Sequence, residues 1–155
     1  MKKLLTTTLC LAAAGLFLTG CEGTRGGAGP RGPVSIIKPP HLDDLMNVAS
    51  QATTELLTHS SIADARTKPV MEFAPIRNAT RARIQIEQVT GRIEDELINS
   101  GLVRVVHPGA VLPKPPDLFV DGTIMQQDAT FTFQLRLNNS KMERIWGRSI
   151  NIPVR

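Results

Sequence analysis

The sequence predicts a single small α+β domain in which a mixed sheet of about four to five strands packs against two main helices. Two segments with helical apolar spacing fall in the first half of this domain, and strands with alternating apolar and polar residues fill its second half. The expected order is helix, strand, helix and then four strands. This order predicts a sheet with helices on one face and a more polar opposite face.

The N-terminus has the pattern of a bacterial lipoprotein signal. A basic start at Lys2 and Lys3 precedes an apolar run over 4–18, which ends in Leu18-Thr19-Gly20-Cys21. This lipobox predicts that residues 1–20 are a signal peptide and that Cys21 is the lipidated first residue of the mature chain. The alternative is an ordinary secretory signal with an incidental cysteine. A transmembrane helix is disfavoured because the run is shorter than the ~20 residues that a span needs.

The second mature residue predicts the destination of the lipoprotein. Glu22 stands where an aspartate would retain a lipoprotein at the inner membrane, so we expect the outer membrane, with the domain facing the periplasm. Three acyl chains on Cys21 would make the attachment effectively permanent, since one chain alone binds a membrane only reversibly.

Composition predicts a linker and excludes some classes of function. Residues 21–40 are rich in glycine and proline and bury little, so we expect a flexible linker before a domain at 41–155. The net charge of +4 falls to +2 without Lys2 and Lys3. The mature chain has no basic run and few aromatic residues, so no nucleic-acid partner is expected. It also has no cysteine pair, because Cys10 leaves with the signal.

The first half of the domain contains both helices. An amphipathic helix is predicted from near His41 to near His59, and a short strand over 70–76. A second helix is predicted through Ile86 and Leu97, with Gly101 as its C-terminal cap.

The second half of the domain is predicted to consist of strands. The pattern predicts a short strand over 103–106, a proline-rich loop over 113–116 and a strand over 118–124. The clearest strand covers 131–137, with apolar and polar residues on opposite faces. Turn residues follow at 138–140, and a last strand over 144–152 places Trp146, Ile150 and Ile152 on one face.

No catalytic, cofactor or metal site is predicted. The histidines His41, His59 and His107 lie far apart near element ends, and no pair has metal-ligand spacing. The carboxylates of 94–96 are read as a solvated helix face, because neighbours on a helix point to different sides. The sequons at Asn78 and Asn138 are read as turn and cap residues, and Trp146 as a core residue rather than a binding aromatic. We therefore expect neither an enzyme nor a small-molecule substrate.

The part from Val70 onward resembles the LpoB family of lipoproteins that activate penicillin-binding proteins. The matching features are ordered: a strand that leads into Asn78-Ala79-Thr80, a helix that ends in 97–101 as Leu-Ile-Asn-Ser-Gly, and valines at 103, 105 and 106. A strand with Gly122-Thr123-Ile124 follows, and then a hairpin that ends in Ile145-Trp146. The lipobox and the linker also fit the family.

The resemblance implies a fold and a function. The fold would be a small α+β domain related in shape to the TolB N-terminal domain. The function would be to bind a class A penicillin-binding protein from the outer membrane and to activate its peptidoglycan synthesis allosterically. The alternative is a structural subunit of an outer-membrane secretion or envelope complex, since CsgG-like lipoproteins share a similar domain. Cys21 is the one site residue assigned, and the residues that contact a partner remain unknown at this point.

Overall fold

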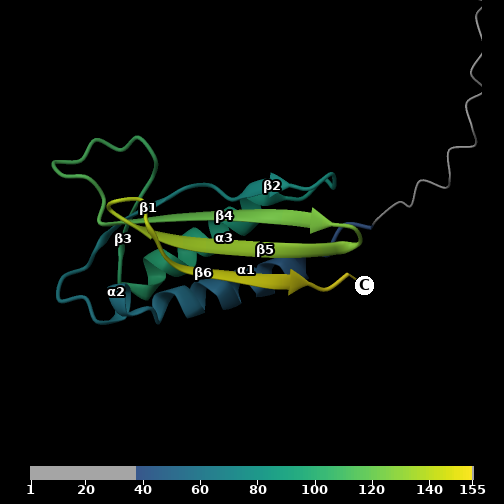
Figure 1. The fold of residues 1–155 in the computed structure, drawn as a ribbon, viewed down its shortest axis with the longest axis horizontal. Helices are drawn as coiled ribbons and strands as arrows, with labels where there is room; N and C mark the ends of the chain where they lie inside the picture. Colours follow the sequence, from purple (N-terminus) through teal and green to yellow (C-terminus); the bar gives the residue numbers. More distant parts are fainter. Residues whose placement is uncertain (1–37, 155) are drawn as a thin grey trace, which may run out of the picture. The chain divides into compact units, whose positions relative to one another are not determined.

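The computed structural model describes residues 38–154, which include one sheet and three helices (Figure 1). Helix α1 covers Leu42–Leu57, the short α2 covers Ser60–Ala63 and α3 covers Ile86–Ser100. Asp43 and Asp44 lie in the first turn of α1, where carboxylates favour the helix dipole. Helix α3 ends at Gly101, which adopts the left-handed conformation with φ of 65° and donates its N–H to Ile98. The glycine cap predicted from the sequence is therefore confirmed.

The sheet contains six strands. They are β1 (Val70–Phe73), β2 (Arg77–Ala79), β3 (Arg104–Val106), β4 (Leu118–Gln127), β5 (Thr130–Asn139) and β6 (Arg144–Ile152). The strand order is β3-β1-β4-β5-β6, and β2 pairs with β4 beyond the short β1. Strands β1, β2 and β3 run parallel to their partners, whereas β4, β5 and β6 form an antiparallel meander.

The mixed sheet follows from the connections. The connection from β1 to β3 runs through β2 and α3, and a parallel pair needs such a crossover. Strands β4 and β5 are joined by a tight turn in which Asp128 has a φ of 52°, as a short hairpin requires. Asp117 ties the loop before β4 to β1, because it accepts from the Val70 N–H at 2.9 Å and returns its own N–H to the Val70 carbonyl.

One hydrophobic core lies between the helices and the sheet. In β5, Phe131, Phe133, Leu135 and Leu137 are fully buried, which confirms the strand face predicted from their alternation. The helices contribute the apolar residues that their spacing predicted, among them Leu45, Leu56, Val89, Ile93 and Leu97. Figure 1 looks onto the sheet, with α3 behind the strands and α1 beside β6. The α+β class with helices on one face is confirmed.

Some boundaries differ from the sequence-based expectation. The first helix ends at Leu57, and a separate turn of helix, α2, begins after His59. The sheet has a sixth strand, β2, at residues that we read as turn and cap. All three residues of β2 are exposed, so no apolar pattern marks this strand in the sequence.

Candidate functional site

The site residues named from the sequence hold structural positions, as far as the structure describes them. Cys21 lies outside the described residues. His41 precedes α1 as its N-cap residue. The Nδ1 atom of His59 accepts the Ser61 N–H at 3.3 Å and so caps α2. His107 lies 3.2 Å from a Glu94 carboxylate oxygen.

The acidic cluster and the sequons also have local roles. Glu96 pairs with Arg92 at 2.6 Å on α3 and accepts the Ser50 hydroxyl of α1, which joins the two helices. Asn78 accepts the Thr80 N–H at 2.9 Å, and Asn139 accepts the N–H groups of Lys141 and Glu143 at 2.9 and 3.0 Å. The Asn78 and Asn139 side chains thus stabilise turns, whereas Asn138 of the second sequon lies in β5 and donates to Asp121. Across residues 38–154 no group of three potential metal ligands gathers, and no helix in that range could cross a membrane.

The face of the sheet opposite the helices is the candidate site. No helix of residues 38–154 covers it, and its side chains come from alternate positions of β4, β5 and β6. We call it the open sheet face. It contains Asp121 and Thr123 on β4, Thr132, Gln134 and Arg136 on β5, and Gly147, Ser149 and Asn151 on β6. Two side-chain hydrogen bonds lie along it, Thr132 to Asn151 and Gln134 to Ser149, each 3.2 Å long.

A bulge in β6 brings a second arginine to the open sheet face. Leu137 pairs with Trp146, but the next residue, Asn138, pairs with Arg144 instead of Ile145. Ile145 is therefore an extra residue in the strand. Uninterrupted alternation would place Arg144 on the helix side with Trp146, whereas the bulge turns Arg144 to the side of Arg136.

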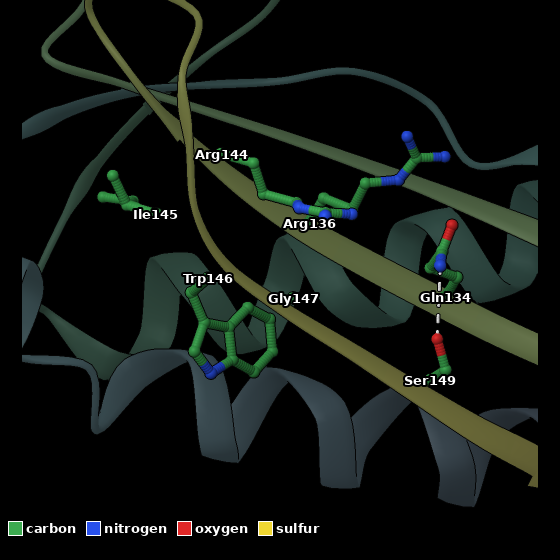
Figure 2. A pocket seen from close by; sticks show the side chains of 7 residues that line it. All are labelled: Gln134, Arg136, Arg144, Ile145, Trp146, Gly147 and Ser149. Atoms are coloured by element: carbon green, nitrogen blue, oxygen red, sulfur yellow. Dashed lines mark hydrogen bonds between the residues drawn. The ribbon is translucent and has the colours of Figure 1, made fainter.

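Arg136 and Arg144 meet over a glycine. A Cβ atom built on Gly147 would lie 3.6 Å from Arg144 Cδ and 4.0 Å from Arg136 Cγ, so both arginine stems rest on the bare backbone there. Figure 2 shows the two arginines together on one side of the strands and the indole of Trp146 on the other. Trp146 is partly buried and packs against the core, as its strand face predicted.

These residues form a shallow pocket of about 400 Å³. Its lining consists of Gln134, Arg136, Arg144, Ile145, Trp146, Gly147 and Ser149. We call it the arginine pocket. It contains two guanidinium groups and no carboxylate, so its chemistry suits an anion.

The hydrogen bonds around Arg136 are incomplete. The Asp121 carboxylate lies 3.6 Å from Arg136 Nε, too far for a hydrogen bond, and it accepts the Asn138 side-chain amide at 3.2 Å. Arg136 Nε is buried without a partner, and so is the hydroxyl of Thr123, which lies diagonally across on β4. Within 38–154 these are the two buried side-chain polar atoms without partners, and both belong to the open sheet face.

Sequence reasoning did not find the arginine pocket. Arg136 was visible as a polar position of a half-buried strand, but the face of Arg144 was not assigned, and simple alternation from Trp146 places it on the helix side. One signal was present: Gly147 is a glycine inside a predicted strand, which often marks a bulge or a close approach of other atoms.

Three comparisons relate the chain to known proteins. Residues 44–113 match the model of the family described as peptidoglycan-synthase activator LpoB. The LpoB C-terminal domain from Salmonella enterica aligns over 72% of this chain and 99% of that chain, with 12% identity and a TM-score of 0.55. The LpoB C-terminal domain from Escherichia coli aligns over 68% and 98%, with 14% identity and a TM-score of 0.51. At these identities the two structures establish a shared fold. The curated proteins contain no match to this sequence.

Proposed function

We propose, from the match of residues 44–113 to the model of the LpoB family of peptidoglycan-synthase activators, that this chain binds a class A penicillin-binding protein and raises its synthesis of peptidoglycan. The observation that carries the proposal is the match to the family model over 44–113, a range that runs from α1 to the loop after β3. The protein would act as a regulator, and the synthase would perform the chemistry.

The proposed mechanism is allosteric. Binding would favour the active conformation of the synthase, and the gain in activity is limited by how much more tightly the lipoprotein binds that conformation. A tenfold shift toward the active state requires a difference in binding free energy of about 1.4 kcal/mol, which a few interface contacts can supply.

We further propose that Cys21 carries the lipid and that the domain faces the periplasm from the outer membrane. The lipobox at 18–21 and Glu22 support this assignment. The stretch from Glu22 to Pro40 would reach at most about 65 Å when fully extended. As a coil it would average about 25 Å, so the synthase would have to extend toward the outer membrane.

The alternative function, a structural subunit of an outer-membrane secretion complex, receives no support from the family match. It predicts a homo-oligomeric ring, whereas an activator predicts a complex with a synthase.

The activator proposal can be tested with the chain from residue 22 onward, without signal and lipid. Adding it to purified class A synthases of the same organism should raise glycan polymerisation or crosslinking by at least one of them. Leu135→Asp, which places a charge in the core, is the control for nonspecific effects. If the chain neither binds nor stimulates any of these synthases, the activator proposal fails, and a ring seen by light scattering would favour the alternative.

A further inference from the structure

We propose that the arginine pocket is the contact site for an acidic segment of the synthase, with a carboxylate seated between Arg136 and Arg144. This inference rests on the proposed function and adds to it a surface and the chemistry of the partner.

The first argument is that the polar atoms of the two guanidinium groups are only partly bonded within the domain. Arg144 forms no side-chain hydrogen bond or ion pair with any other residue of 38–154. Arg136 has Asp121 at 3.6 Å, while its buried Nε lacks a hydrogen bond. The stems of both arginines lie beside Gly147, so an incoming carboxylate could accept hydrogen bonds from the two guanidinium groups.

The second argument is the backbone that brings the arginines together. The bulge at Ile145 interrupts the ladder between β5 and β6, and Gly147 leaves an edge strand without a side chain at the pocket floor. Both features weaken a strand, and bulges commonly serve to re-aim a side chain. Here the bulge and the glycine together allow Arg144 to lie beside Arg136 on the open sheet face.

The third argument is the distribution of charge. Helices α1 and α3 together contain seven acidic residues and one basic residue, whereas the other residues of 38–154 contain six acidic and twelve basic ones. The two helices are thus acidic, and the rest of the domain, which includes the open sheet face, is basic. An acidic partner would be repelled by the helices and attracted to the rest of the domain.

The surroundings favour a protein partner over the cell-wall polymer, which also contains carboxylates. The pocket is shallow and is flanked by Gln134 and Ser149, whose side chains can bond to a polar protein surface. The indole of Trp146 points away from the two guanidinium groups, so it offers no ring beside them on which a sugar could stack.

The test uses the complete lipoprotein in detergent and compares variants for binding to the purified synthase. The double variant Arg136→Gln/Arg144→Gln should raise the Kd about tenfold or more, and added salt should weaken its binding less than that of the unchanged protein. Arg148→Gln is the matched control. It removes one arginine charge from β6, the strand of Arg144, but Arg148 lies on the helix side and pairs with Glu55 at 2.9 Å. Its Kd should stay within about twofold of the unchanged protein.

Two further variants separate geometry from charge. Gly147→Val keeps both arginines and fills the pocket floor, and it should weaken binding although the net charge is unchanged. Arg136→Lys/Arg144→Lys keeps the charge and loses the planar forks, so its Kd should fall between those of the unchanged protein and the glutamine variant. Thermal unfolding of every variant verifies that the domain remains folded.

Two additional binding measurements, one with an acidic peptide and one with isolated cell-wall sacculi, test the chemistry of the partner. A poly-glutamate peptide should bind the unchanged protein and lose affinity with Arg136→Gln/Arg144→Gln, but not with Arg148→Gln. If no synthase binds the unchanged lipoprotein, the proposed function fails, and the peptide arm alone decides whether the pocket accepts acidic segments. Folded glutamine variants that bind the synthase as tightly as the unchanged protein overturn the inference. Loss of binding to isolated cell-wall sacculi, with synthase binding unchanged, also overturns it.

Discussion

Gly122 lies in the middle of β4, where a side chain would collide with the core. A Cβ atom at this position would come 2.4 Å from Ile76 Cδ1 and 3.3 Å from the backbone oxygen of Gln134. The side chain of Ile76 could rotate away, but the backbone of β5 could move only by breaking its hydrogen bonds to β4. Glycine here lets Ile76, which is buried, pack directly against the strand.

We therefore predict that Gly122→Ala destabilises the domain by about 1–3 kcal/mol, as overpacked core positions do. Thermal or urea unfolding, followed by circular dichroism, measures the change. Gly91→Ala in α3 is the matched control, because no atom lies within 4 Å of its added Cβ. In a helix that change should stabilise by about 0.5–1 kcal/mol. Equal melting points for the two variants would contradict the close packing at Gly122.

Cys21 is the residue on which membrane attachment depends in our proposal. Cys21→Ser should leave the signal uncleaved by the lipoprotein peptidase and the protein without acyl groups, because the thiol is the acceptor of the first lipid. Mass spectrometry and membrane fractionation measure both effects. A variant that fractionates like the unchanged protein, together with an unchanged protein that lacks acyl groups, would rule out the lipoprotein assignment.

The two faces of β5 differ in what they contact, and this difference can be measured. Phe133 is fully buried between the sheet and the helices, whereas Thr132 is on the open sheet face and bonds to Asn151. On β6, Trp146 is partly buried beside its cross-strand partner Leu137. Its contribution to the free energy of unfolding should therefore lie between those of Phe133 and Thr132.

We predict that Phe133→Ala lowers the free energy of unfolding by about 3–5 kcal/mol, Trp146→Ala by about 2 kcal/mol and Thr132→Ala by less than about 1 kcal/mol. Urea unfolding of the three variants under identical conditions measures the loss of stability in each and so tests the predicted order. Comparable losses for Phe133→Ala and Thr132→Ala would mean that the two faces of β5 are wrongly assigned.

The domain and its predicted anchor have separable tasks. Contact with the synthase would be made by the folded domain, while the lipid and the linker would set its location and its effective concentration. Binding in solution should therefore not depend on the length of the linker, whereas activation in cells should.

Removing about half of the residues between Glu22 and Pro40 would reduce the extended reach from about 65 Å to about 35 Å. We predict that this deletion reduces activation in cells and leaves the Kd for the purified synthase unchanged. Labelling of new peptidoglycan measures the first effect and a solution binding assay the second. A deletion replaced by an equally long Gly/Ser segment is the control. Unimpaired activation by the shortened chain would contradict a role of reach.

Much of the fold could be predicted from the sequence because local patterns determine it. The alternation over 131–137, the helical spacing from Ile86 to Leu97 and the glycine after that helix each depend on neighbours in the chain, and all three predictions are confirmed. The α+β class and the resemblance to the LpoB family are confirmed as well, since both depend on the order of such elements. Lipidation of Cys21 stays a prediction.

The tertiary structure alone decided how distant strands pair. Strand β2 forms because Arg77–Ala79 pairs with the free edge of β4. Its three residues are all exposed, so their sequence has no apolar pattern that would predict this pairing. The same holds for the arginine pocket. The strand over 144–152 was predicted with the observed bounds, but the bulge at Ile145 appears only once β6 is paired with β5. One extra residue reverses the direction of the next side chain, so the face of Arg144 depends on a long-range register that no local pattern specifies.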